Sequence, residues 1–235
     1  MEFHFKKFIL LAFTFILFVP IGTLSHELGH GAAIKLLGYS AELHYASISY
    51  DSEKLYNEFE EIYLAHEAAI ENNKDFQNKA RYVFLSDKLK SDGFWITLGG
   101  PAQTIGFGTL AFLLLLYFGR KYREMPFSLW HWFLVFTSLF WLRFICNPFL
   151  SIGSELIAPN GSFFGGDERE LAMHFNLWEG SVSLPLAFLG SIICAYVTFR
   201  VVPKAISVTF IAAALVGGSF GYLIWLVLLG PIVMP

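Results

Sequence analysis

The sequence predicts an all-α polytopic membrane protein with about five transmembrane helices, a small interfacial β-strand or hairpin, and an extramembrane helical insertion. Three observations lead to this fold class. The chain of 235 residues is 55% hydrophobic and only 15% charged, a composition typical of integral membrane proteins. It contains several apolar runs long enough to cross a bilayer. Between the first two runs lies a polar, acidic stretch without an apolar run of that length.

Five apolar segments are expected to be transmembrane helices of one membrane domain that comprises residues 1–235. They cover about residues 8–37, 94–118, 129–150, 184–202 and 206–233. The first segment follows two lysines, an arrangement that a secretory signal also shows. We interpret it as a permanent helix, because cleavage near Ser25 would leave His26 and His30 on a loose N-terminus.

Residues 39–93 are expected to form the extramembrane or interfacial insertion. The stretch from Leu43 to Tyr50 has strand-like composition and partial alternation, which predicts a β-strand or hairpin. Residues 55–89 are amphipathic and predict a helix. This helix contains His66 followed by a glutamate, but no second histidine follows at the spacing that a metal site needs. A solvated helix face is the better interpretation of that pair.

The segment from Ser25 to Gly31 reads Ser-His-Glu-Leu-Gly-His-Gly, near the end of the first apolar run. His26 and His30 are four residues apart, so on a helix their imidazoles lie on one face and can bind one metal ion. Glu27 then lies beside the ion without having to bind it. This arrangement is typical of zinc hydrolases, in which a third protein ligand and a water complete a tetrahedron and the glutamate accepts a proton from the water.

The depth of the motif in the membrane supports a functional interpretation. A helix from Phe8 to Leu37 is about 45 Å long, so the motif lies within the outgoing third of the bilayer. In a soluble protein a five-residue match of this kind is often just an exposed helix face. Two histidines and a glutamate inside a lipid-embedded helix are costly unless they have a function. We therefore predict a metal site.

Polar and helix-breaking residues also interrupt the next two spans. Residues 98–103 read Leu-Gly-Gly-Pro-Ala-Gln. The proline lies either in the first turn of the second span or inside the span, where neighbouring protein or water must satisfy the freed backbone groups. The third span ends with Arg143, Asn147 and Pro148. Arg143 is interpreted as a side chain that reaches the membrane surface.

Taken in order, these motifs resemble the site-two protease family of intramembrane zinc metalloproteases. The resemblance consists of His-Glu-Leu-Gly-His in the first span, a Gly-Pro element at the next, and Asn-Pro followed by a Gly-flanked Asp. It covers mainly residues 8–38 and 94–175. It implies that His26 and His30 bind Zn²⁺, that Glu27 is the general base, and that an Asp from a later part of the chain is the third ligand.

The third ligand departs from the family pattern, in which the Asp follows Asn-Pro almost directly or lies in Leu-Asp-Gly. Here Asn147-Pro148 is followed by Phe149, and the Gly-flanked acid arrives only at Asp167. We predict Asp167 as the ligand, because the two glycines let the backbone come close and a helix is expected to follow. A helix N-cap is the other role that suits Asp167. The alternative ligands are Glu168, Glu155 and His174.

These assignments predict an intramembrane zinc metalloprotease that works in a lipid bilayer on a transmembrane protein or peptide substrate. Two alternatives stay open: a zinc-dependent membrane hydrolase of a lipid or small amide, and a catalytically idle membrane scaffold. The net charge of −3 argues against a nucleic-acid partner. Cys146 and Cys194 are expected to act as small buried hydrophobes. The sequence specifies no oligomeric state.

The charge pattern predicts an orientation in what we expect to be a bacterial cell membrane. Short basic segments at Lys6-Lys7, 120–123 and 200–204 alternate with the acidic connections 39–93 and 151–181. The positive-inside rule then places the N-terminus in the cytoplasm and, with five spans, the C-terminus outside. The metal site is accordingly expected towards the exterior face, whereas the better-known members of the family carry their zinc nearer the cytoplasm.

Overall fold

The computed structural model describes residues 3–119, 127–159 and 161–235. Within these ranges, five helical segments are long and apolar enough to cross a membrane, and the sheet has two short strands. The five segments are Phe5–Leu36, Lys79–Phe118, Leu129–Ile157, Gly180–Val201 and Lys204–Val233. The expected fold of mostly helical, multi-pass type is confirmed at this level.

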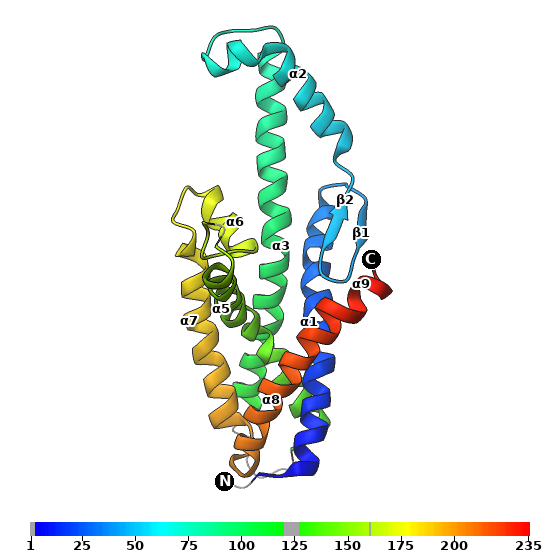
Figure 1. The fold of residues 1–235 in the computed structure, drawn as a ribbon, viewed down its shortest axis with the longest axis vertical. Coiled ribbons are helices and arrows are strands. Elements are labelled where there is room, and N and C mark those ends of the chain that lie inside the picture. Colours follow the sequence, from blue (N-terminus) through cyan, green and yellow to red (C-terminus); the bar gives the residue numbers. More distant parts are fainter. Residues whose placement is uncertain (1–2, 120–126, 160) are drawn as a thin grey trace.

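The bundle is elongated, and most of its helices run along its long axis (Figure 1). Its principal helices are α1 Phe5–Leu36, α3 Lys79–Gly119, α4 Leu129–Ser138, α5 Leu142–Ile157, α7 Gly180–Tyr196 and α8 Ser207–Tyr222. Short 3-10 or π segments and a last turn connect or extend them: η1 Leu139–Trp141, η2 Val197–Val201, η3 Lys204–Ile206, η4 Leu223–Leu229 and α9 Gly230–Val233. α1 is central, because it packs against both α3 and α8.

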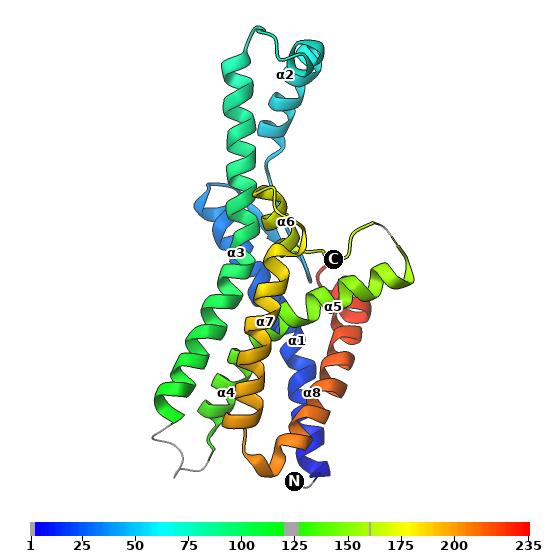
Figure 2. The same ribbon diagram turned by 90° about the vertical axis from the view of Figure 1, so that its left-hand side faces the viewer.

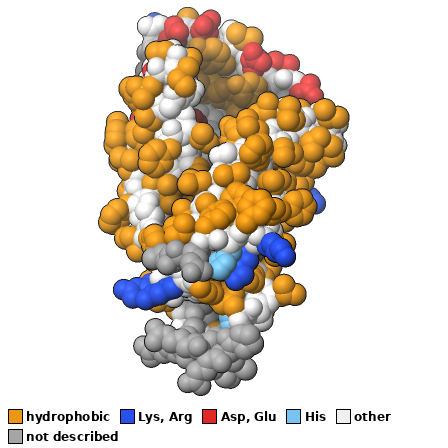
Figure 3. Space-filling view, turned by 60° about the horizontal axis from the view of Figure 1, so that its bottom comes forward, with side chains coloured by type: hydrophobic (Ala, Val, Ile, Leu, Met, Phe, Trp, Pro, Cys, Tyr) orange, Lys and Arg blue, Asp and Glu red, His pale blue; other side chains and the backbone are white. Residues whose placement is uncertain are grey.

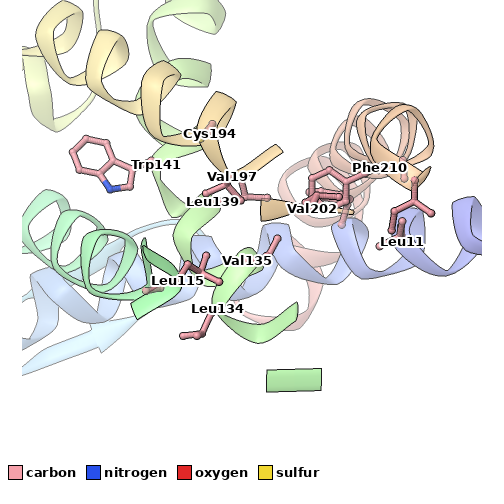
Figure 4. Packing of buried hydrophobic residues seen from close by; sticks show 14 of the residues in the cluster. Leu11, Leu115, Leu134, Val135, Leu139, Trp141, Cys194, Val197, Val202 and Phe210 are labelled. Carbon is pink, nitrogen blue, oxygen red and sulfur yellow. The ribbon is translucent and has the colours of Figure 1, made fainter. Parts of the chain in front are cut away.

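The apolar core joins α1, α3, α4 and α8 (Figure 4). Leu11 of α1, Leu115 of α3, Val135 of α4 and Phe210 of α8 are all buried there. Other apolar side chains on the same helices stay exposed on the outside of the bundle, among them Phe13, Ile21 and Leu110. An apolar core with an equally apolar exterior is what a helix bundle needs when lipid is its solvent.

The predicted strand at residues 43–50 is a hairpin whose strands are shorter than that stretch. β1 (Ala41–Leu43) pairs antiparallel with β2 (Ile48–Tyr50), and residues 44–47 form the turn. The hairpin lies on the last turns of α1. Its turn is held by the end of the chain, because the backbone N–H of Tyr45 donates to the carbonyl oxygen of Met234 at 3.0 Å.

The helix predicted over residues 55–89 is in fact two helices. α2 (Glu53–Glu71) ends before a turn in which Asn73 and Asn78 adopt positive φ, a conformation that asparagine tolerates better than most residues. α3 then begins at Lys79, so the helix of the second span starts well before the predicted residue 94. α2 buries none of its residues, as expected for a solvated helix.

The third span is bent at η1. α4 runs along the bundle, while α5 turns across it (Figure 2). α5 continues through the buried Pro148 to Ile157, beyond the predicted end of this span at residue 150. The short helix α6 (Asp167–His174) follows and packs against α3 and α7. The bend and the position of α6 bring the third span and its following loop to the middle of α1 and α3.

The two ends of the bundle differ in charge. The start of α1 and the connection from α7 to α8 lie at one end, and α2 lies beyond the other (Figure 1). Lys6, Lys7, Arg200 and Lys204 are therefore at one end, and Figure 3 shows Lys and Arg side chains there with acidic side chains at the far end. The third predicted basic segment, residues 120–123, is outside the described residues.

Candidate metal centre

Two buried imidazoles of α1 form the start of the site. The side chains of His26 and His30 are 0% and 9% exposed, and their Nε2 atoms lie 3.2 Å apart. Glu27 is also buried, and one carboxylate oxygen lies within 4.8 Å of a nitrogen of each histidine. The four-residue spacing on a helix thus does place both rings on one face, and the three residues form a buried group that could hold a metal ion.

Asp167 joins the two histidines from a distant part of the chain. Its Oδ2 lies 2.8 Å from Nε2 of His26 and 3.3 Å from Nε2 of His30. α6 begins at Asp167 itself, and its N-cap is Gly166, so Asp167 does not have the N-cap role considered from the sequence. Gly166 has φ of +73°, a conformation that glycine adopts without strain and that turns the chain into the helix at this point.

The outer nitrogen of each ring has a partner that fixes its orientation. Nδ1 of His30 donates to the backbone carbonyl of Ile96 at 2.6 Å. Nδ1 of His26 lies 2.9 Å from the hydroxyl of Thr104, which itself donates to Oε1 of Gln103 at 3.3 Å. Because Thr104 donates its hydroxyl proton to Gln103, its oxygen can only accept a hydrogen bond from His26. We therefore assign the proton of His26 to Nδ1 as well. Both Nε2 atoms then point their lone pairs towards Asp167.

The spacing of this donor set is close to that of a tetrahedral metal site. In the tautomers assigned above, two imidazole lone pairs and one carboxylate oxygen are separated by 2.8, 3.2 and 3.3 Å. A tetrahedral ion with bonds of about 2.0–2.1 Å needs ligand atoms about 3.3 Å apart. Three acceptors this close repel one another unless a cation or a shared proton lies between them, and the buried group around His26 and His30 could hold a metal ion.

The middle of α3 leaves space beside the two rings. A Cβ added to Gly100 would lie 2.5 Å from Nε2 of His26 and still closer to Nε2 of His30, so any side chain here would displace the imidazoles. One turn along, a Cβ on Gly29 would lie 2.5 Å from the carbonyl oxygen of Gly99. The Gly-Gly-Pro sequence lies inside α3 and not at its start, and its glycines let α3 come close to α1.

The two acids at the start of α6 lie in different surroundings. Asp167 contacts both imidazoles and is partly exposed. The neighbouring Glu168 is buried, and burial raises its pKa. Its two carboxylate oxygens each lie 3.4 Å from Nδ2 of Asn147. Asn147 therefore holds the residue next to Asp167 in place.

The other candidate ligands have different roles. Glu155 accepts a hydrogen bond from the backbone N–H of Gly161 at 2.9 Å. His174 is exposed and packs its ring against Phe94 at 4.7 Å between centroids. Glu168 lies beside the triad but contacts Asn147. Of the four acids and histidines considered as third ligand, Asp167 is the one that contacts His26 and His30.

Sequence reasoning missed the groups that orient the rings. Thr104 carries no motif of its own, although its position shortly after Gly-Gly-Pro was a signal that this part of α3 lies near the metal site. The carbonyl of Ile96 has no side-chain signal at all. Arg143 was interpreted as a surface-seeking side chain; in the structure it is partly exposed and lines a cavity together with Thr104 and Asn147.

Comparison of the chain with protein families, with curated proteins and with solved structures gave no match. The site itself consists of two histidines and an aspartate facing one point, a glutamate beside them, and two orienting partners outside the rings.

Proposed function

We propose that this protein is an intramembrane zinc metalloprotease that hydrolyses peptide bonds of transmembrane segments. The observation that carries the proposal is the convergence of three lone-pair donors, His26, His30 and Asp167, inside a bundle of helices that are apolar enough to span a membrane. Ionisable groups in such a setting are costly and are normally retained for function.

The ligand set supports zinc among the common metals. Two neutral imidazoles and one carboxylate, with a fourth position left for water, are a frequent catalytic zinc set. Calcium and magnesium prefer sites made of oxygen atoms alone. The hydrogen bonds of both Nδ1 atoms add the outer contacts that fix histidine ligands in their metal-binding tautomer.

Glu27 is the proposed general base. Zinc, when bound, supplies Lewis acidity that lowers the pKa of water towards neutrality and polarises a carbonyl group. Glu27 accepts the proton of the attacking water and delivers it to the leaving amine. Its carboxylate lies close to both histidines but outside the triad, which is the position that this proton transfer requires.

The first test compares Glu27→Gln with His26→Ala in purified protein. We expect about one zinc ion per chain in the wild type. Glu27→Gln should keep the metal and lose hydrolysis of membrane peptides, because the glutamate acts on the water while the histidines hold the ion. His26→Ala should lose both. Near-normal turnover of Glu27→Gln would show that the base is another group.

The second test concerns the third ligand and has a matched control on the same helix. Asp167→Ala should lower zinc occupancy strongly, because a catalytic zinc normally has three protein ligands. Glu170→Ala removes the same charge from an exposed position of α6 and should leave occupancy unchanged. Equal metal content in both variants would assign the third ligand to Glu168, the acid next to the triad.

We also propose that β2 holds the substrate as an added strand. A transmembrane helix hides its carbonyl groups in hydrogen bonds, so it must be unwound locally before hydrolysis. The hairpin packs directly after the motif: a Cβ on Gly31 would lie 2.8 Å from Cδ1 of Ile48. Strand addition supplies backbone hydrogen bonds that do not depend on substrate sequence. Proline scanning of residues 48–50 should slow cleavage at alternate positions; unchanged cleavage throughout would remove the strand from the mechanism.

We propose that the N-terminus lies in the cytoplasm and that the metal site lies towards the exterior. It can be tested with single cysteines in a chain whose Cys146 and Cys194 are replaced by serine. A cysteine at the exposed Glu60 of α2 should react with a membrane-impermeant thiol reagent in intact cells. A cysteine at the exposed Lys204, at the basic end, should react only after the cells are opened. The reverse result would place the site on the cytoplasmic side.

A further inference from the structure

A large cavity lies between α1, α5 and α8 in the membrane-spanning part of the bundle. Its volume is about 770 Å³, within the range of about 300–1,000 Å³ typical of ligand pockets. α5, which turns across the bundle (Figure 2), forms one side of it. Most of its wall is apolar, including Phe15, Phe18, Phe140, Leu215 and Leu226.

The cavity adjoins the metal centre. Thr104, whose hydroxyl lies 2.9 Å from Nδ1 of His26, forms part of its wall. Asn147, the partner of Glu168, forms another part. A molecule in the cavity is therefore separated from the metal ligands by one side chain.

Arg143 is the one charged residue among the described residues that line this cavity. It lies one helical turn before Asn147, so both are on the same face of α5. Its Nε is buried and has no hydrogen-bond partner in the described part of the chain. None of the ion pairs between described residues includes Arg143.

A partly buried guanidinium without an ion pair in largely apolar surroundings is unfavourable, because the charge loses part of its hydration without a close counter-charge. The acids at the start of α6 form no ion pair with it: Asp167 contacts the histidines and Glu168 contacts Asn147. A guanidinium presents a fork of N–H donors that matches a carboxylate. The chemistry of the cavity is thus complementary to an apolar chain that carries one anion.

We propose that Arg143 binds a carboxylate of the substrate, so that the protein selects apolar membrane peptides with an acidic side chain close to the bond that is cut. This proposal rests on the proposed protease function and adds a substrate preference to it. Such a preference would be selective, because acidic side chains are rare in transmembrane segments. The acid lies near the cut bond because Arg143 lines the same cavity as Thr104, the partner of His26.

The test uses fluorescent Leu/Ala membrane peptides that each carry a single Glu at one position, and a matching set with Gln. Binding is measured in Glu27→Gln protein, so that no hydrolysis is needed. We expect the best Glu peptide to bind at least about tenfold more tightly than its Gln partner. Adding Arg143→Gln should abolish this difference, whereas Arg200→Gln, an exposed arginine away from the cavity, should leave it unchanged.

Cleavage by protein with an intact Glu27 separates the two proposals. Peptides that bind through Arg143 and are never cut would overturn the protease function and leave the carboxylate site. Cleavage of Glu and Gln peptides at equal rates would overturn the carboxylate site and leave the protease. A preference for Glu peptides that persists in Arg143→Gln would also overturn the carboxylate site. Should that variant not fold, Arg143→Lys, which keeps the charge and loses the fork, is expected to weaken the preference.

An anionic lipid is the competing occupant. Vesicles that contain phosphatidylglycerol should not erase the Glu preference seen in vesicles of neutral lipid. If they do erase it, and if they bind in an Arg143-dependent manner, the cavity is a lipid site and the substrate proposal is wrong.

Discussion

α1 makes two close helix contacts that depend on glycine, one with α8 and one with α3, and only one of them has a candidate active site. At the α8 contact, a Cβ on Gly217 would lie 2.8 Å from Cβ of Phe15, and one on Gly221 would lie 2.8 Å from Cγ2 of Val19. The neighbours are apolar side chains and backbone. Contacts of small residues are how helices pack in lipid, where there is no hydrophobic drive for association.

At the α3 contact the approach is equally close, but the neighbours are polar. Gly29 faces Gly99, and Gly100 faces the two imidazoles. Ser25 and Gln103 are linked across the same contact by a hydrogen bond of 2.5 Å. A small-residue contact in a membrane bundle is thus by itself only packing. It becomes a site where it brings ionisable groups of one helix against backbone and polar groups of the next.

The comparison predicts the largest effect for Gly100→Ala. The added methyl group would occupy the space against both Nε2 atoms, so the rings must move away from Asp167 and metal binding should be lost together with hydrolysis. Zinc content and peptide cleavage of the purified variant measure this. Gly106→Ala is the matched control, because a Cβ there meets nothing within 4 Å on the same helix. Full zinc content in Gly100→Ala would contradict the metal geometry.

A smaller effect is expected for Thr104→Val, which keeps the shape of the side chain but removes the hydrogen bond to Nδ1 of His26. Loss of such an outer partner typically weakens metal affinity by about 10–100-fold. Titration with a zinc chelator measures the change, and Thr104→Ser, which retains the hydroxyl, should stay near the wild-type value. If valine and serine behave alike, the hydroxyl has no role in holding the ring.

The smallest effect on the site is expected for Gly217→Ala, in the apolar contact. Overpacking against Phe15 and the backbone of Ala12 should lower the free energy of unfolding by about 1–3 kcal/mol. The folded fraction should keep its zinc, because no ligand lies at this contact. Thermal unfolding and metal analysis together measure this. Gly218→Ala, next to it in open space, is the control, and metal loss in Gly217→Ala alone would mean that the two contacts are coupled.

Much of the fold was predictable because apolar runs of membrane length report directly on spans. The boundaries that differ have local causes. The helix predicted over 55–89 is divided by a turn at Asn73 and Asn78, and an amphipathic pattern does not register a change of direction. The second span is continuous with a more polar helical part that begins at Lys79. Hydropathy reports only where the apolar part of such a helix begins.

The five apolar segments and the pairing of His26 with His30 could be predicted from local sequence, because four-residue spacing on a helix is a local property. The glycines before Asp167 also indicated that residue. Three relations could be found only in the folded chain: Oδ2 of Asp167 lies against both Nε2 atoms, Thr104 and the carbonyl of Ile96 contact the rings, and Arg143 lines a cavity. Those relations depend on the bend at η1 and on the close approach of α1 and α3, and both arise from packing between segments far apart in the chain.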